Sequence, residues 1–470
     1  MPKKITRTER LAIELVKRLR SGIYSDGRLP SQRRLAEYFG VSRNTVVNAL
    51  ARLEADGWIA TSERRRAALT PPDFAFARRL SAFLSGSDFR PPLMNDAFGR
   101  QDSQTGDPTE SIDLARLCHE HWDDHIQFDM ENAAVQRAMA RIRRGESDIY
   151  RTTGVEQLKT AICRYLKRFE IAAGPHQIAI ISRRLQAYRA VSEILLGPKI
   201  EMWAPELSLV RFYGVAERHA AKRRYLEMDV DGRINFDAML FSKRPKVVFL
   251  EPTRQKPTGS SLSIEERRQL VDEARRSRTF IFEDAYCELL YENHLPFMAS
   301  FDPKLESVIH LGAIPTWLTP IGGFSFILAH ERIIELLRAS ARRDYLNPEF
   351  LTQLTALELL ESDGLDEMLR RFHAFHRRRL RFVAEILARD TGEYACPVLP
   401  GSFGCVWLHF DAADIGALYR ARRGIDFQPG WFYGESARSC RHVLIRYTMP
   451  EAVFDEGMAR FGALCRSELG

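Results

Sequence analysis

Apolar residues recur at helical spacing in three stretches near the start of the chain. Each stretch returns an apolar side chain to the same helix face every three or four positions, which predicts three short amphipathic helices within the first 55 residues. The predicted inward residues are Leu11, Leu15 and Leu19 in the first helix, Leu35, Ala36 and Phe39 in the second, and Val46, Leu50 and Leu53 in the third. A small, mostly helical domain is therefore expected here.

Polar residues and a glycine mark the ends of the second and third helices. Ser31 is a suitable N-cap for the second helix, Gly40 suits its C-terminal stop, and Ser42 can cap the third. The outward residues at the start of the third helix are all polar: Arg43, Asn44, Thr45 and Asn48. Two short helices joined by a tight turn, with polar residues opening the second, are typical of a helix-turn-helix that enters the major groove of DNA.

Beyond residue 150, short apolar runs alternate with helix-length segments. The runs cover residues 178–181, 247–250, 280–282 and 308–309. Continuous apolar strands are usually buried on both faces, which predicts an α/β fold whose parallel or mixed sheet is covered by helices. Ligand sites in such sheets lie beyond the carboxyl ends of the strands. The candidate site segments are therefore residues 182–186, 251–259, 283–286 and 311–320.

A proline-rich and polar stretch separates these two patterns. It contains Pro71-Pro72, Pro91-Pro92 and a polar run at residues 99–108, and one short helix is predicted around residues 76–83. This composition predicts a linker over residues 71–110. We therefore expect a DNA-binding domain at residues 1–70 and a larger domain at residues 111–470.

The length and composition agree with a two-domain globular protein. The chain has 470 residues, of which 45% are hydrophobic and 28% charged, and this length exceeds what one core usually supports. No apolar run is long enough to span a membrane and no apolar signal segment follows Met1, so a cytoplasmic location is expected. Seven scattered cysteines without a CxxC pair argue against a disulfide framework and a zinc ribbon.

One cluster of metal-ligand residue types lies just after the predicted linker. Its members are Cys118, His119, His121, Asp123, Asp124 and His125. His121 and His125 lie four residues apart, but their order does not match HExxH and no second cluster of ligands follows. A polar helix face is therefore favoured over a metal site, and no metal is expected.

The positive charge is concentrated at the start of the chain. Residues 1–66 contain 15 Lys and Arg and 7 Asp and Glu, a net charge of +8, whereas the whole chain carries +7. The remainder of the chain is therefore close to neutral. A local excess of this kind favours a polyanion such as DNA, although a basic solvated face is the alternative.

Residues 29–59 (LPSQRRLAEYFGVSRNTVVNALARLEADGWI) resemble the winged helix-turn-helix of GntR-type bacterial repressors. The resemblance implies that Arg33 and Arg43 contact base edges or phosphates. It also implies that Ser31, Asn44 and Thr45 bind the DNA backbone. For each arginine the alternative interpretation is a solvated surface charge.

The segment after this match departs from the GntR pattern. Family members usually carry a glycine at the tip of the wing hairpin, whereas residues 62–68 read SERRRAA. Arg64 and Arg65, followed by Arg66, are candidates to bind the minor groove or phosphates. The missing glycine leaves open whether the hairpin forms.

The larger domain resembles fold-type-I pyridoxal phosphate (PLP) enzymes, and together with the GntR-type head it resembles the MocR subfamily of regulators. The best anchors are Gly154 with Leu158, Pro257-Thr258-Gly259, Glu283-Asp284-Ala285-Tyr286 and Leu444-Ile445-Arg446. The resemblance implies a mixed, mostly parallel sheet flanked by helices, a smaller C-terminal α+β subdomain and a homodimer. It further implies that Asp284 faces the pyridine nitrogen, Tyr286 the ring hydroxyl, and Arg446 a substrate carboxylate.

Four positions depart from the PLP-enzyme pattern together. Thr316 stands where the family has its Schiff-base lysine, and a hydroxyl cannot form a Schiff base. Arg184, preceded by Arg183, replaces the glycine that lets a helix N-terminus approach phosphate. Gly323 replaces a phosphate-binding arginine, and Leu207 an aromatic residue that contacts the ring. We therefore expect no PLP bound as an internal aldimine and no transamination.

Several cationic residues surround the expected cofactor position. Arg183, Arg184 and Arg254 favour an anionic small molecule, such as a carboxylate or a phosphate, as an effector. The alternative is that these arginines form salt bridges that fill the pocket. Lys256 precedes Pro257 and has three interpretations: a solvated lysine, an ammonium that fills the cofactor space, or the amine of a relocated aldimine.

These observations predict a DNA-binding transcription regulator whose aminotransferase-like domain dimerises and lacks catalysis. Its expected partners are a double-stranded DNA operator, a second copy of the chain and an anionic effector. The alternatives are a PLP-sensing regulator that uses a relocated lysine, an active aminotransferase, and a constitutive DNA-binding scaffold without an effector.

Overall fold

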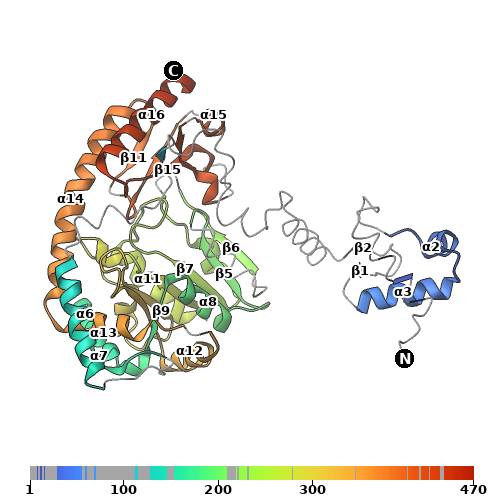
Figure 1. Ribbon diagram of the computed structural model, residues 1–470, viewed down its shortest axis with the longest axis horizontal. Helices are drawn as coiled ribbons and strands as arrows, with labels where there is room; N and C mark the ends of the chain where they lie inside the picture. The colour runs from blue at the N-terminus through green and yellow to red at the C-terminus, as the bar shows by residue number, and fades with distance from the viewer. Residues whose placement is uncertain are drawn as a thin grey trace. The chain divides into compact units, whose positions relative to one another are not determined.

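The computed structural model divides into two compact units, Met1–Asp102 and Ser103–Gly470, which we describe separately (Figure 1). The structure describes residues 8, 11–12, 15, 29–55, 59–60, 68–69, 112–114, 128–145, 153–208, 219, 222–229, 232–277, 279–344, 346–399, 401–411, 414–422, 424–434 and 439–469. The predicted linker helix at residues 76–83 and the cluster from Cys118 to His125 lie outside these residues. No helix within the described ranges is both long and apolar enough to cross a bilayer.

The first unit contains the predicted helix-turn-helix. Its elements are α2 (Gln32–Phe39), α3 (Arg43–Ala55), β1 (Ile59–Ala60) and β2 (Ala68–Leu69). A single apolar cluster joins α2, α3 and β1, and it includes Leu11, Leu15, Leu35, Val46, Leu50 and Leu53, all predicted as inward. Ala36 and Phe39 pack against this cluster, whereas Leu19 lies outside the described residues.

The predicted helix ends are confirmed. The Ser31 hydroxyl accepts a hydrogen bond from the backbone N–H of Arg34 at 3.3 Å, which caps α2. Gly40 ends α2 with φ of 59°, a left-handed conformation that glycine adopts at low cost. The Ser42 hydroxyl accepts a hydrogen bond from the backbone N–H of Thr45 at 3.2 Å and opens α3. These caps fix the tight turn between the two helices.

A seven-stranded mixed sheet organises the second unit, as predicted. Its spatial order is β4-β10-β9-β8-β7-β5-β6, in which β10 runs antiparallel to both neighbours and the other described pairs are parallel. The strands are β4 (Ile178–Ile181), β5 (Glu201–Pro205), β6 (Lys222–Leu226), β7 (Lys246–Leu250), β8 (Thr279–Asp284), β9 (Val308–Ile314) and β10 (Phe324–Leu328).

Successive residues of the central strands enter two different apolar cores. In β7, Val248 and Leu250 belong to one cluster, whereas Val247 and Phe249 belong to the other. The same alternation in β4 explains why all four of its residues are buried. Helices α8 (Arg184–Leu195) and α12 (Glu331–Asp344) contribute to the second cluster, and α7 (Glu156–Leu166), α11 (Ile264–Arg276) and α13 (Phe350–Glu361) to the first. The sheet is therefore the middle of three layers.

A smaller antiparallel sheet follows towards the C-terminus. It contains β11 (Cys396–Val398), β12 (Cys405–His409), β15 (His442–Arg446) and β14 (Gln428–Pro429), in that spatial order. Its helices are α15 (Ile415–Ala421) and α16 (Glu451–Leu469), and the long α14 (Gly364–Thr391) runs from the region of α6 (Phe128–Arg143) and α13 to α16 (Figure 1). A short parallel pair joins β13 (Ile425–Asp426) to β3 (Ile112–Asp113). This α+β subdomain was predicted.

The remaining elements are short. They are α10 (Asp237–Phe241) and the 3-10 turns η1 (Lys167–Phe169), η2 (Pro175–Gln177), η3 (Glu288–Leu290), η4 (Met298–Phe301), η5 (Gly430–Phe432) and η6 (Ser439–Arg441).

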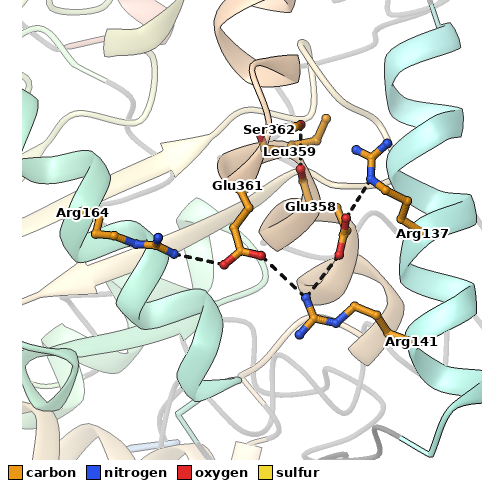
Figure 2. Close-up of polar contacts among 7 residues, drawn as sticks. All are labelled: Arg137, Arg141, Arg164, Glu358, Leu359, Glu361 and Ser362. Carbon is orange, nitrogen blue, oxygen red and sulfur yellow. Dashed lines mark hydrogen bonds and ion pairs between the residues drawn. The ribbon is translucent and has the colours of Figure 1, made fainter.

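An ion-pair network joins α6, α7 and α13 (Figure 2). Glu358 on α13 accepts from Arg137 Nε at 2.8 Å and from Arg141 Nη1 at 3.2 Å. Glu361, one turn further along α13, lies 3.0 Å from Arg164 Nη2 and 3.8 Å from Arg141 Nη1. Arg141 bridges the two glutamates, so the three helices share one network instead of separate surface pairs.

Candidate functional sites

The helix-turn-helix exposes most of the predicted DNA-contact residues. Arg43 and Asn44 are exposed at the start of α3, and Thr45 is half-buried, with its hydroxyl 2.8 Å from that of Ser42. Arg33 is exposed on α2, where its Nε lies 3.1 Å from Glu37 Oε1. With 88% of the Arg33 side chain exposed, this pair is weak and leaves the guanidinium accessible to a phosphate.

The two strands of the wing pair although the segment between them contains no glycine. Ile59 lies opposite Leu69, and Ala60 opposite Ala68, in an antiparallel pair. The sequence did not decide whether this hairpin forms, and the structure shows that the two strands pair at its base. Arg64 and Arg65 lie outside the described residues.

A small cavity lies at the carboxyl ends of β7 and β8. It is lined by Arg184, Glu251, Thr253, Arg254, Lys256, Asp284, Cys287, Glu288 and Tyr291. Its volume is about 10 Å³, which holds roughly one water molecule. Four of the predicted pocket residues line it, namely Arg184, Arg254, Lys256 and Asp284, whereas Arg183, Tyr286, Thr316 and Arg446 do not.

Arg184 and Asp284 form the centre of this cavity. Arg184 Nε donates to Asp284 Oδ2 at 2.5 Å, and Arg184 Nη2 contacts Glu251 Oε1. The Tyr188 hydroxyl, one helical turn after Arg184, donates to the same Oδ2 at 2.6 Å. The backbone N–H of Tyr286 donates to the other oxygen, Oδ1, at 3.1 Å. Both oxygens of Asp284 are therefore engaged by groups of the chain itself.

The ionisation of the cavity residues follows from burial and from these contacts. Burial is the largest single influence and would lower the pKa of Arg184, but the charge of Asp284, the neighbouring Tyr188 and Cys287 and the hydrogen bond to Asp284 together outweigh it. The net pKa is raised, so the guanidinium stays charged. Burial first, and then the Asp284 charge, raise the pKa of Tyr188 well above its usual value. Tyr188 is therefore a permanent hydrogen-bond donor.

Thr316 lies beside Tyr286 rather than in the cavity. Burial raises the pKa of the Tyr286 phenol, and a hydrogen bond with the Thr316 side chain opposes that rise. Tyr286 in turn packs against Arg184, whose guanidinium carbon lies 5.6 Å from the centre of the phenol ring. Thr316 and Tyr286 thus contact each other next to Arg184. The Thr316 side chain has a hydroxyl in place of an amine, so it cannot form a Schiff base with an aldehyde.

The loop after Thr316 leaves no space for a side chain at position 323. A Cβ on Gly323 would lie 2.7 Å from the Thr316 Cα and 2.7 Å from the Thr319 carbonyl oxygen. Glu131 on α6 holds the same loop, because its Oε1 accepts the backbone N–H groups of Ile321 at 2.8 Å and Gly322 at 3.0 Å. An arginine at position 323 would therefore require this loop to move.

The side chains of Arg254 and Lys256 line the cavity, and neither forms an ion pair with a carboxylate of the described residues. Arg254 stacks on Tyr291, with its guanidinium carbon 4.5 Å from the ring centre. The Lys256 backbone N–H donates to Glu251 Oε2 at 2.8 Å. Burial raises the pKa of Cys287, and the Lys256 charge opposes that rise. In the part of the chain that the structure describes, neither cationic side chain forms an ion pair.

Arg183 and Arg446 are not among the residues that line the cavity. Arg183 is the exposed residue that precedes α8, and its backbone N–H donates to Gln186 Oε1 at 3.1 Å. Arg446 is buried at the end of β15, where its backbone N–H donates to the Leu114 carbonyl at 2.8 Å. Neither Arg446 nor Tyr286 is among the residues that line this cavity, so their predicted place beside Asp284 in one effector pocket stays a prediction.

The sequence analysis missed Tyr188, which bonds to Asp284, and did not single out five of the residues that line the cavity: Glu251, Thr253, Cys287, Glu288 and Tyr291. Tyr188 follows Arg184 by one helical turn, and this i, i+4 spacing is a signal that could have identified it. Glu251 lies within a segment that was named but was not singled out. Cys287 and Tyr291 follow the strand end at residues 283–286 and carry no recognisable signal, because the turn after β8 sets their position.

These residues do not fit a PLP Schiff base. Asp284 is already bound to Arg184 and Tyr188, position 316 carries a hydroxyl, and position 323 has no room for a phosphate-binding side chain. A cavity of about 10 Å³ is also far smaller than the several hundred Å³ typical of cofactor sites.

Comparison with known proteins agrees with both units. Residues 7–69 match the family of bacterial regulatory proteins of the gntR type. The HTH-type transcriptional regulator NorG of Staphylococcus aureus (strain USA300) is 24% identical over 434 residues, covering 88% of this chain and 94% of NorG. The "Probable rhizopine catabolism regulatory protein MocR" of Rhizobium meliloti is 25% identical over 423 residues, covering 88% of this chain and 80% of that protein.

The structural neighbours share the fold of the second unit. LysN, an α-aminoadipate aminotransferase of Thermus thermophilus, superimposes with a TM-score of 0.65 at 20% identity, covering 77% of this chain and 93% of LysN. At this identity the likeness establishes the fold and not the chemistry. The chain is a transcriptional regulator of the MocR type, in which a GntR-type helix-turn-helix domain is joined to a domain with the aminotransferase fold.

Proposed function

We propose that the protein regulates transcription as a cytoplasmic homodimer and that its aminotransferase-like domain neither binds PLP as a Schiff base nor catalyses transamination. The observation that carries this proposal is the ion pair between Arg184 and Asp284. It engages the carboxylate that the aminotransferase resemblance assigns to the pyridine nitrogen. Thr316, without an amine, removes the covalent attachment as well.

The DNA contacts are proposed from exposure and position. Arg43 and Asn44 open α3, are exposed and do not belong to the apolar cluster of this unit. A guanidinium at this place can donate two hydrogen bonds to guanine O6 and N7 in the major groove. A homodimer would present two such helices to paired operator half-sites.

An anionic effector is a second candidate function of the same domain. Arg254 and Lys256 present cationic groups to the cavity and form no ion pair among the described residues, whereas Arg184 is already neutralised by two carboxylates. A small carboxylate or phosphate would therefore bind Arg254 and Lys256 rather than Arg184. A domain without any effector is the alternative, and operator affinity unchanged across a metabolite screen would favour it.

The test is an absorbance spectrum of the purified protein with and without added PLP, followed by borohydride reduction and mass spectrometry. We expect no new band attributable to a Schiff base and no covalent adduct, together with specific binding to an operator fragment. An adduct on Lys256 would instead support a PLP-sensing regulator with a relocated lysine. Measurable transamination of any amino acid would establish an active aminotransferase and contradict the proposal.

A further inference from the structure

The side chain of Arg184 extends into the site at the ends of β7 and β8. Arg184, the first residue of α8, reaches Asp284 at the end of β8 and Glu251 just after β7. The side chains of Arg184 and Glu251 are 13% and 15% exposed, and that of Asp284 is fully buried. A buried carboxylate is costly unless a cation or several N–H donors compensate it, and here Arg184 provides the cation.

A guanidinium and a protonated pyridine ring share the properties needed to pair with the Asp284 carboxylate. Both are flat, delocalised cations that donate N–H hydrogen bonds to a carboxylate. We propose that the guanidinium of Arg184 permanently occupies this cavity and replaces, within the chain, the planar cation that a bound cofactor would supply to Asp284. The premise is the cofactor independence proposed above.

The surroundings of Arg184 support a permanent occupant. Tyr188 and the backbone of Tyr286 complete the hydrogen bonds of Asp284, and the Tyr286 ring packs against the guanidinium. Glu251 holds the far side of the guanidinium and also binds the backbone N–H of Lys256. Arg184 therefore connects the ends of two strands with the start of α8, and its side chain leaves only about 10 Å³ of the cavity free.

The first test replaces the occupant with a free molecule. Arg184→Ala removes the part of the side chain that ethylguanidinium reproduces. We expect this variant to melt several degrees below the wild type and to recover most of the loss in low millimolar ethylguanidinium chloride, compared with equal sodium chloride. Arg189→Ala, on the exposed face of the same helix, is the matched control and should show neither effect. A variant as stable as the control, or one that ethylguanidinium does not stabilise, would overturn the proposal.

A charge-removing variant keeps the proposal testable if Arg184→Ala does not fold. Combining Arg184→Ala with Asp284→Asn removes the uncompensated carboxylate, so the double variant should be more stable than Arg184→Ala alone. A double variant that is equally unstable, or less stable, would contradict the role of Arg184 as the counter-ion of Asp284.

A second test asks whether the occupant excludes PLP. Thr316→Lys supplies the missing amine, yet we expect it to give no borohydride-trapped adduct while Arg184 is present. Thr316→Lys combined with Arg184→Ala should give an adduct on the introduced lysine. Equal trapping in both variants would refute the exclusion by Arg184, whereas an adduct in the wild-type protein would refute the proposed function instead.

Discussion

The hydroxyl of Tyr188 donates a hydrogen bond to Asp284 Oδ2 at 2.6 Å, and both residues are buried. Hydrogen bonds to a buried charged group contribute more than neutral ones, because the carboxylate has no water to replace the lost donor. We expect Tyr188→Phe to lower the free energy of unfolding by about 1.5–3 kcal/mol. Chemical denaturation measures this loss.

Tyr225→Phe is the matched control for this prediction. Tyr225 lies on the edge strand β6 and is 38% exposed, so water can replace its hydrogen bonds and the change should cost less than about 0.5 kcal/mol. Equal losses in the two variants would show that the Tyr188 hydroxyl has no special role at Asp284.

Arg43 is expected to read the operator. Arg43→Ala should weaken specific DNA binding by roughly 1–3 kcal/mol if the guanidinium bonds a base edge, and the change should relax specificity at one base pair. Operator titrations with point-substituted fragments measure both effects. Arg52→Ala, in the last turn of the same helix, should reduce affinity less and without a change in base preference. A uniform loss across all fragments would reassign Arg43 to a phosphate contact.

Glu358 is expected to be the most important residue of the network between α6, α7 and α13. Its side chain is 14% exposed and binds both Arg137 and Arg141, whereas Glu361 is 41% exposed. Glu358→Gln should therefore destabilise the protein by about 1–2 kcal/mol, between the values for surface and buried pairs. Glu361→Gln should lower the free energy of unfolding by less than about 1 kcal/mol, and at high salt this variant should be as stable as the wild type. The opposite order in denaturation experiments would contradict the assignment.

Much of the fold follows from local sequence patterns. The predicted apolar runs agree with the ends of β4, β7 and β8 to within one or two residues, because strands buried on both faces contain few polar positions. Strand β9 extends to Ile314, beyond the predicted run, and includes Gly312, over which the Phe326 ring packs. Strand β6 (Lys222–Leu226) was missed because it is an edge strand of mostly exposed, charged residues.

The candidate site was predictable only in part. Position in the chain identified Arg184, Arg254, Lys256 and Asp284, since strand ends gather in space. The sequence left two alternatives for Arg184, an anion-binding site or a salt bridge. The outcome depends on Glu251, which contacts Arg184, and on Tyr188, which bonds to Asp284, and these contacts form only in the folded chain. The structure favours the salt bridge for Arg184. Arg254 and Lys256 also line the cavity, and their side chains form no salt bridge with the described residues.

His376 is expected to make stability depend on pH in mildly acidic solution. Its ring is buried in α14, Nε2 lies 3.1 Å from the Tyr447 hydroxyl, and the pKa is lowered from 6.5 to about 4, first by burial and then by the charge of Arg254. The unfolded chain therefore binds a proton between pH 6.5 and 4 that the folded chain does not bind. The stability from this residue is complete above pH 6.5 and is lost as pH falls towards 4, by up to about 3 kcal/mol.

Unfolding free energies measured from pH 7.5 down to pH 4.5 test this prediction. His376→Gln has no titrating ring, so it should be less stable than the wild type at neutral pH but should lose less stability on acidification. His176, which lies outside the core in η2, provides a control in the variant His176→Gln, whose pH profile should match the wild type. A wild-type profile that is flat in this range, or one that His376→Gln leaves unchanged, would show that His376 does not titrate as its burial requires.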